Sequence, residues 1–336
     1  MRFSPKKAIK PLIVALLVSL VVLCGAALVL ATLVPAQEPR GDLDNLDFTE
    51  LATDSAPPPE TRSYTARDGT ELSYRHYPAQ ADATEADTAV VLLHGSAYHS
   101  GYLAPLAHAL ADQGAAEVYT PDLRGHGPET EDRGDVDHIG QLEEDLADFA
   151  EFLDAERNHA RLLLAGHSSG GGTALRFAGG QSSSGRFDGY ALLAPYIHHT
   201  APTYREGTWA TVNTPRMAGL SMLNAVGVTA FNAGPVISFN MPERRRDGTE
   251  TLQYSYDLQI SMHPRGDYAA DIAALPPDPL VLAGTEDETF HADRYPEVFA
   301  PHPTAEVRLL EGVSHFGVVN DEAAQQALVQ WVEAGG

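Results

Sequence analysis

The sequence predicts an α/β fold: a mostly parallel sheet with helices on both faces and an inserted cap, preceded by one N-terminal transmembrane helix. Short continuous apolar runs, such as "TAVVLLHG" from Thr88 and "ARLLLAGHS" from Ala160, have the composition of strands buried on both faces. These runs alternate with stretches of helical period, which is typical of a parallel sheet covered by helices. The 336 residues suffice for one large domain of this kind with an insertion.

The elements follow in chain order. Residues 61–78 contain two short strand patterns around Asp68-Gly69, which predicts a hairpin. After the first buried strand come a helix pattern ending at Gly114 and a strand pattern that runs into a turn at residues 115–127. Residues 138–158 form the strongest amphipathic helix pattern. The apolar positions of that pattern are Ile139, Leu142, Leu146, Phe149, Phe152 and Leu153.

The alternation of strand and helix patterns is interrupted once and then resumes. Residues 196–275, rich in Gly, Met, Tyr and Phe, show no strand–helix rhythm and are predicted to form the cap. A strand, helix, strand, helix series follows between residues 278 and 335. The whole body is therefore predicted to span residues 61–336, with the cap as its insertion.

The N-terminus is predicted to be a membrane anchor. Residues 12–34 are apolar and uncharged, and they are long enough to cross a bilayer core of ~30 Å at about 1.5 Å per residue. Because residues 1–11 are basic, this end should stay in the cytoplasm and the body should be extracytoplasmic, in the periplasm or outside the cell. As alternatives, Val34-Pro35-Ala36 could be a signal cleavage site that yields a secreted form, or Cys24 could carry a lipid.

Composition narrows the possible partners. The formal net charge is −24, and no lysine occurs after Lys10, so the surface should repel nucleic acid and anionic lipid head groups. The acidic, proline-containing residues 35–60 are interpreted as a linker. One cysteine excludes an internal disulfide. His198 and His199 have no third ligand at a useful spacing, so neither a metal nor a cofactor is expected.

A candidate nucleophile lies at the end of the strand "ARLLLAGHS". Gly166-His167-Ser168-Ser169-Gly170 matches the G-x-S-x-G elbow, in which a sharp strand-to-helix turn exposes the serine. Side chains at the flanking positions would collide with neighbouring elements, so glycines are needed there. The following helix would point its N-terminal N–H groups at a developing oxyanion.

A serine hydroxyl needs a base and an orienting acid. In this architecture both follow the serine in the chain, the acid first and then the basic histidine. Asp287, with Glu286 and Glu288 beside it, follows one late strand, and His315 follows the next. The order and the spacing predict Asp287 as the acid and His315 as the base, the carboxylate fixing the imidazole tautomer.

The oxyanion hole requires two N–H donors. One is expected from Ser169, directly after the nucleophile, and the other from the loop after "VVLLHG". The residue that follows His94-Gly95 in that loop is Ser96, which is therefore the second candidate.

These motifs together resemble the α/β-hydrolase superfamily, and most closely its monoacylglycerol lipase and lysophospholipase-like branch. The matching stretches are "LLHGSAYHSGY", "PDLRGHG", "LLLAGHSSGG", "AGTEDETF" and "GVSHF". The resemblance covers about residues 62–335 outside the insertion, and implies Ser168 as nucleophile, Asp287 as acid, His315 as base, and Ser96 and Ser169 as oxyanion donors.

The sequence departs from that branch in three places. Ser169 stands where the branch often has methionine, Pro128 stands where it often has serine, and the insertion does not follow the branch's lid. The substrate class is therefore less closely determined than the superfamily.

The expected activity is hydrolysis of short-chain or monoacyl carboxylic esters through an acyl-enzyme on Ser168. The apolar, Met-rich insertion suits an acyl chain, and Tyr98, Tyr196, Trp209 and Phe239 are the candidate substrate-binding residues. Amide, peptide or thioester hydrolysis would use the same triad. A non-catalytic binding protein on the same fold is the alternative from another class.

Overall fold

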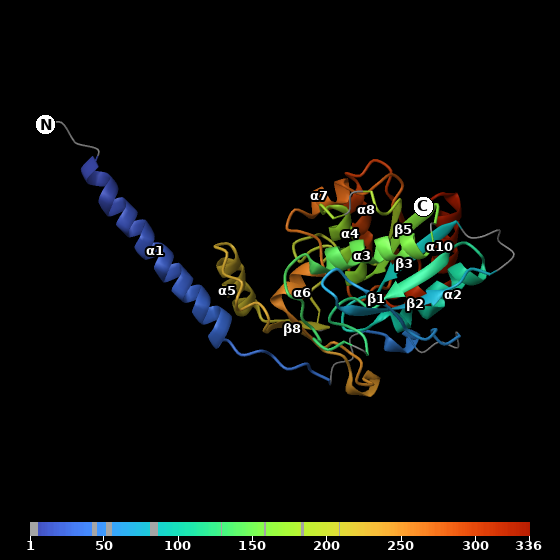
Figure 1. Cartoon of the computed structure of the whole chain (residues 1–336), viewed down its shortest axis with the longest axis horizontal. Helices are drawn as coiled ribbons and strands as arrows, with labels where there is room; N and C mark the ends of the chain where they lie inside the picture. Colours follow the sequence, from blue (N-terminus) through green and yellow to red (C-terminus); the bar gives the residue numbers. More distant parts are fainter. Residues whose placement is uncertain are drawn as a thin grey trace.

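A computed structural model describes residues 6–41, 46–51, 56–80, 87–128, 130–157, 159–182, 185–207 and 209–336. Residues 1–5 of the predicted basic N-terminus, and residues 42–45 and 52–55 of the predicted linker, lie outside the described residues. A twisted sheet and its covering helices form the body, and one long helix extends away from it (Figure 1).

The central sheet has eight strands in the order β1-β2-β4-β3-β5-β6-β10-β11. Their bounds are β1 Arg62–Thr65, β2 Glu71–Tyr77, β3 Thr88–Leu93, β4 Glu117–Pro121, β5 Arg161–His167, β6 Gly189–Leu193, β10 Leu280–Gly284 and β11 Glu306–Leu310. β2 pairs antiparallel with β1 and β4, and the other pairs are parallel. The hairpin and the parallel sheet expected from the sequence are both present.

Alternate residues of the central strands serve two separate cores. In β5, Leu162 and Leu164 pack on one face of the sheet, whereas Leu163 and Ala165 pack on the other. This period of two explains why the strands are apolar throughout, since neither face meets water.

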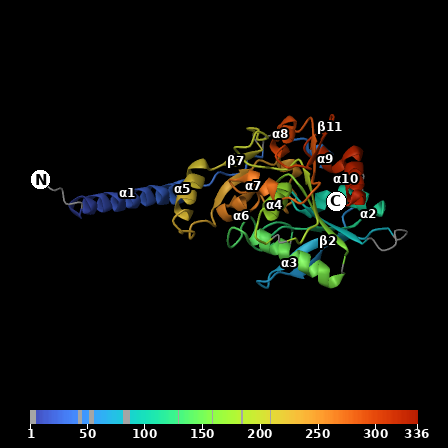
Figure 2. The same ribbon diagram turned by 90° about the horizontal axis from the view of Figure 1, so that it is seen from above.

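Helices cover both faces, as the alternation of patterns predicts (Figures 1 and 2). On one face lie α2 Ala104–Asp112, α9 Gly317–Asn320 and α10 Glu322–Ala334. On the other lie α3 Gln141–Glu156 and α4 Ser169–Ala178. Two short helical segments, η4 Ala292–Arg294 and α8 Tyr295–Phe299, connect β10 to β11, and η2 Ser100–Leu103 precedes α2.

Between β6 and β10 the chain forms the region predicted as the cap. It contains a second sheet of three antiparallel strands in the order β7-β8-β9, which the sequence did not indicate. The elements are β7 Ala210–Val212, α5 Thr214–Asn224, β8 Pro235–Phe239, η3 Glu243–Arg245, β9 Gln253–Ser255, α6 Tyr256–Ser261 and α7 Tyr268–Ala273.

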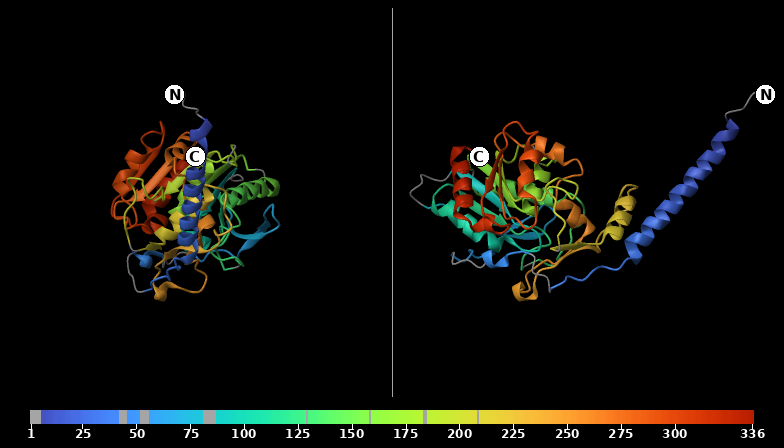
Figure 3. Two further views of the ribbon diagram at one scale, coloured as in Figure 1. Left: turned by 90° about the vertical axis from the view of Figure 1, so that its left-hand side faces the viewer. Right: turned by 180° about the vertical axis from the view of Figure 1, so that it is seen from behind.

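The N-terminal helix α1 spans Lys6–Leu33, and the views in Figure 3 show it projecting from the body beyond α5. Its C-terminal part packs on α5 through small residues. Ala27 and Ala31 are fully buried, and a Cβ placed on Gly219 would lie 2.6 Å from the Ala27 carbonyl oxygen. Within the part of the chain that the structure describes, no helix is both long and apolar enough to cross a membrane.

The described parts of the predicted linker contact the body. Asn213 donates a 2.9 Å hydrogen bond to the carbonyl of Pro35, and Gln253 donates one of 2.9 Å to the carbonyl of Gln37. A short 3-10 helix, η1 Phe48–Leu51, then lies against α9. The composition of residues 35–60 gave no sign of these contacts.

Candidate active site

The elbow places Ser168 between the end of β5 and the start of α4. Its backbone has φ 56° and ψ −123°, a strained conformation for a residue with a side chain. A Cβ on Gly166 would lie 2.4 Å from the Gly170 carbonyl oxygen, and a Cβ on Gly170 would lie 2.4 Å from that of His94. Both glycines of the motif are therefore required by close backbone approach, as the sequence predicts.

The structure brings the three predicted catalytic side chains together. Nε2 of His315 lies 3.0 Å from Oγ of Ser168, and Nδ1 lies 2.9 Å from Oδ2 of Asp287. Since an ionised carboxylate only accepts hydrogen bonds, Nδ1 carries the proton and Nε2 is free to accept one from the serine. The imidazole is thus held in the tautomer that a general base needs.

Asp287 is kept ionised by its surroundings. It is 2% exposed, and this burial acts to raise its pKa. His315, together with the amides of Phe290 and Thr289 at 2.8 and 2.7 Å, outweighs burial, so the pKa of Asp287 lies below its usual value of 3.8.

The parallel strands of the sheet bring the three triad residues together. Ser168, Asp287 and His315 come from the loops after β5, β10 and β11, and parallel strands bring these loops to one edge. Of the two acids beside Asp287, Glu286 is exposed, while Glu288 accepts a 3.0 Å hydrogen bond from the backbone N–H of His315.

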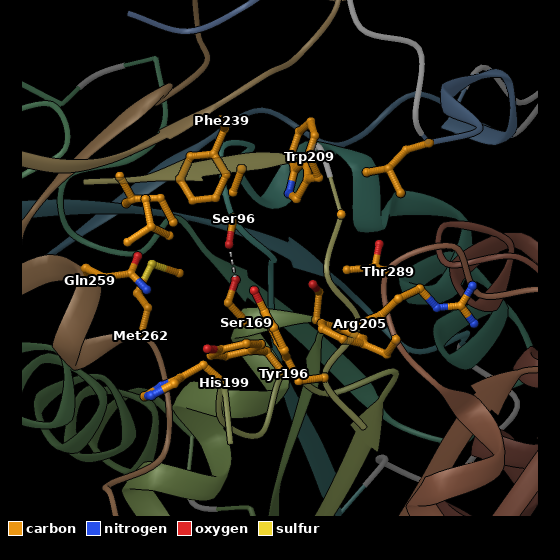
Figure 4. Close-up of a pocket in the computed structure, with 18 of the residues that line it drawn as sticks. Ser96, Ser169, Tyr196, His199, Arg205, Trp209, Phe239, Gln259, Met262 and Thr289 are labelled. Carbon is orange, nitrogen blue, oxygen red and sulfur yellow. Dashed lines mark hydrogen bonds between the residues drawn. The ribbon is translucent and has the colours of Figure 1, made fainter. Parts of the chain in front are cut away.

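The loop after β3 carries the second oxyanion candidate. The amide of Gly95 donates to the hydroxyl of Tyr102 at 2.7 Å, and the amide of Ala97 donates to the hydroxyl of Tyr254 at 2.8 Å. The amide of Ser96 lies between these two engaged groups, in the loop next to the elbow. The hydroxyls of Ser96 and Ser169 are 2.5 Å apart, which brings the two predicted donor residues together (Figure 4).

His94 fixes that loop. Its Nε2 accepts a 3.0 Å hydrogen bond from the amide of Leu123, so its Nδ1–H donates to the Gly95 carbonyl at 2.8 Å. Burial lowers the pKa of His94 to about 4, and the ring is neutral at pH 7.

Sequence reasoning missed one hydrogen-bonded chain behind the triad. Because the hydroxyl of Tyr102 accepts from Gly95, it donates to Nδ1 of His167 at 2.8 Å. Nε2–H of His167 then donates to the carbonyl of His315 at 3.0 Å. Burial, followed by the charge of His315, lowers the pKa of His167 to about 3, so this link stays neutral. The elbow motif located His167 without revealing this role.

A cavity of about 380 Å³ opens beside Ser168, Ser96 and Ser169. Of the predicted substrate-binding residues, Tyr196, Trp209 and Phe239 line it, with Trp209 and Phe239 on one side and Tyr196 on the other (Figure 4). Further apolar residues of the lining are Leu46, Ala210, Val212, Ile237, Met262 and Phe290.

Tyr98, the fourth predicted substrate-binding residue, is not among the described residues that line this cavity. Its ring packs into an aromatic cluster instead. The ring centroids of Tyr102 and Phe316 lie 5.5 and 6.0 Å from its own. Closeness in sequence to Ser96 does not determine which way the ring points.

The described residues contain no group of three or more His, Cys, Asp or Glu side chains arranged to hold a metal ion. The rings of His198 and His199 lie 4.1 Å apart, and His199 lines the cavity.

The predicted catalytic residues and oxyanion donors together offer a nucleophile, a base, an acid and backbone N–H groups. These are the groups that acyl transfer requires.

A family model described as serine aminopeptidase, S33, matches residues 84–285, more than half of the chain. The match includes the elbow, and ends just before Asp287. A protein of Escherichia coli (strain K12), uncharacterized protein YnbC, is 29% identical over 149 residues. That stretch is 44% of this chain and 22% of YnbC, so the match spans about a fifth of that relative's length.

Solved structures share the fold at low identity. A soluble variant of monoglyceride lipase from Saccharomyces cerevisiae, in complex with a substrate analog, has a TM-score of 0.64 at 18% identity, over 84% of this chain and 96% of that one. A monoacylglycerol lipase from Paleococcus ferrophilus has a TM-score of 0.57 at 19% identity, over 80% and 100%. A membrane phospholipase A, a bacterial virulence factor, has a TM-score of 0.54 at 17% identity, over 98% of each chain.

Proposed function

The chain belongs to the serine aminopeptidase S33 family of α/β-hydrolases, and we propose that it cleaves short-chain or monoacyl carboxylic esters through an acyl-enzyme on Ser168. The observation that carries this proposal is the apolar cavity joined directly to Ser168. Its volume of about 380 Å³ and its aliphatic and aromatic lining suit a single acyl chain.

The cavity is less suited to an aminopeptidase. Such an enzyme needs a carboxylate to bind the substrate's terminal ammonium group, and Glu288 is the one carboxylate among the described residues that line the cavity. Its two oxygens accept hydrogen bonds from the amides of Asp47 and His315, each at 3.0 Å. A carboxylate held in this way acts first as a support for the backbone, and so we place amide and peptide substrates second.

The reaction begins with proton transfer from Ser168 to Nε2 of His315 as the serine oxygen attacks the ester carbonyl. The carbonyl oxygen becomes an oxyanion, which the amides of Ser96 and Ser169 stabilise. Asp287 stabilises the imidazolium that forms on His315. Collapse of the intermediate breaks the ester bond, and His315 gives its proton to the leaving alkoxide.

The second half-reaction uses the same groups. Water donates a proton to Nε2 of His315 and attacks the acyl carbonyl, and the same oxyanion donors stabilise the second intermediate. Its collapse releases the carboxylic acid and returns the proton to Ser168, so the enzyme ends as it began. Loss of one oxyanion donor is expected to reduce kcat by about 10²–10³.

The proposal is tested by hydrolysis of p-nitrophenyl esters from acetate to palmitate, in parallel with an alanine p-nitroanilide. Ser168→Ala should abolish ester hydrolysis, and Ser63→Ala, a substitution at an exposed serine of β1, should not change it. Faster release from the anilide than from every ester would replace the esterase proposal with an aminopeptidase. Absence of both hydrolysis and labelling of Ser168 by a fluorophosphonate would instead favour the binding-protein alternative.

We also propose that residues 12–34 anchor the enzyme, with the body extracytoplasmic. This proposal rests on the apolar, uncharged sequence of the segment and on the basic residues before it. The protein should remain with membranes after a high-salt wash and enter detergent. Recovery of a soluble form beginning near Gln37 would show a cleaved signal peptide in its place.

A further inference from the structure

The short segment Leu46–Leu51, which precedes the body in the chain, lies against the active site. Leu46 is 6% exposed and lines the cavity that holds Ser168. Phe48 is 3% exposed, and its ring centroid lies 5.6 Å from that of Trp209 in the cap and 5.5 Å from that of Phe316. Phe48 thus bridges Trp209 of the cap and Phe316, the residue that follows His315.

The same segment makes polar contacts with Glu288, which binds the amide of His315, and with Ser314. The amide of Asp47 donates to Oε1 of Glu288 at 3.0 Å, while Oε2 of that glutamate accepts from the amide of His315. Glu50 accepts a hydrogen bond from the hydroxyl of Ser314, the residue before His315.

Further contacts tie Glu50 to α9, which follows the His315 loop. The backbone carbonyl of Glu50 accepts from the side-chain amide of Asn320. The hydroxyl of Ser314, which donates to Glu50, also accepts from the amide of Gly317 at 3.0 Å. A Cβ on Gly317 would lie 2.7 Å from the Glu50 carboxylate, so the segment is seated closely on this loop.

From these contacts we propose that Leu46–Leu51 affects both substrate specificity and the position of the catalytic histidine. Leu46 limits the space for the substrate's acyl chain, and Glu50 positions the His315 loop through Ser314. The first effect rests on the proposed function, since it names an acyl substrate. The second effect does not rest on the proposed function, because it concerns the geometry of the triad and is independent of the substrate.

The specificity effect is tested with two variants of opposite size in the full chain. Leu46→Trp fills cavity space, so kcat/KM should fall more for p-nitrophenyl octanoate than for the acetate, by about 10-fold or more in the ratio. Leu46→Ala should shift the preference toward longer chains. If both variants keep the wild-type octanoate-to-acetate ratio, Leu46 does not determine chain length.

The positioning effect is tested by the rate of fluorophosphonate labelling of Ser168, which needs no knowledge of the substrate. Glu50→Ala should slow labelling about 10-fold, whereas Glu50→Gln, which keeps an acceptor for Ser314, should recover most of the rate. Glu60→Ala is the matched control, because Glu60 is an exposed residue of the same stretch 35–60. Thermal melts of all three variants establish that they are folded before rates are compared.

The outcomes separate the two proposals. Wild-type labelling in Glu50→Ala, or a loss that Glu50→Gln does not relieve, overturns the positioning effect. A wild-type protein that labels at Ser168 but hydrolyses no ester overturns the esterase proposal, while the comparison of labelling rates still decides the role of Glu50. Failure of Leu46→Trp to fold leaves Leu46→Ala to decide the specificity effect.

Discussion

Lowering the pH from 7 to 5 should destabilise the folded body, because histidines next to the active site are buried in their neutral form. Burial lowers the pKa of His94 to about 4, and burial with the charge of His315 lowers that of His167 to about 3. His126, packed beside His94, has a pKa well below its usual value for the same first reason, burial.

The sign follows from proton binding. An unfolded histidine takes up its proton near pH 6.5, whereas folded His94 and His167 stay neutral until the pH approaches 4 and 3, respectively. The unfolded state therefore binds more protons between these limits, and the free energy of unfolding falls as the pH falls through this window. Integrated from pH 7 to pH 5, His94 and His167 each lower that free energy by about 2 kcal/mol.

His94 and His167 together lower the free energy of unfolding by about 4 kcal/mol, against a total of about 5–15 kcal/mol for a typical domain. The pKa of Asp287 lies below 3.8, so the stability it contributes is lost only at lower pH. Asp145 and Asp257, whose pKa values are raised chiefly by burial, contribute with the opposite sign as the pH falls.

The measurement is urea unfolding at pH 7, 6 and 5, followed by tryptophan fluorescence and extrapolated to zero urea. His167→Gln removes one buried titrating group, so its loss between pH 7 and 5 should be smaller than wild type by about 2 kcal/mol. His138→Gln, at an exposed position, should keep the wild-type loss. An equal loss in His167→Gln and wild type would refute the reasoning, as would a wild-type free energy that does not change with pH.

Three further substitutions have defined outcomes. Asp287→Asn removes the acceptor that selects the tautomer of the catalytic histidine, so kcat for the best ester should fall by about 10⁴, and a fall of less than 10-fold would contradict that role. Gly170→Ala places a Cβ 2.4 Å from the His94 carbonyl, so the unfolding free energy should drop by about 3 kcal/mol, and an unchanged melt would show that the loop can move. Gly219→Leu should separate α1 from α5, since a Cβ there already meets the Ala27 carbonyl at 2.6 Å; faster proteolysis at residues 34–41 is the expected result, and wild-type digestion would contradict it.

The parts of the fold and the site that could be predicted from the sequence depend on local patterns. The elbow is local in sequence, because the apolar run of β5, the glycines around Ser168 and the following helix are adjacent in the chain. The need for small residues at the two glycine positions can therefore be inferred from the five-residue motif alone. Asp287 and His315 could be placed because parallel strands bring their carboxyl ends to one edge. The positions of the strands in the sequence identified the loops that carry Asp287 and His315, and this needed no knowledge of side-chain direction.

The parts that could not be predicted depend on contacts between distant residues or on side-chain direction. Glu50 and Ser314, which form a hydrogen bond, are 264 positions apart in the chain. Phe48 lies in a short acidic stretch with no regular apolar period, and its burial arises from residues distant in the chain, among them Trp209 and Phe316. The cap strands are three to five residues long, too short for an alternating pattern to stand out.

The contacts of residues 35–41 and 46–51 link the cap to the His315 loop. Residues 35–41 contact the cap sheet, and residues 46–51 contact the loop that carries His315. The chain between Gly41 and Leu46 spans five Cα steps, a reach of at most about 17 Å. Because this reach is limited, a large displacement of the cap must release its contacts with residues 35–41 or pull on the 46–51 segment. The 46–51 segment also lines the cavity through Leu46. Movement of the cap is therefore coupled, through this segment, to the position of the loop that carries His315.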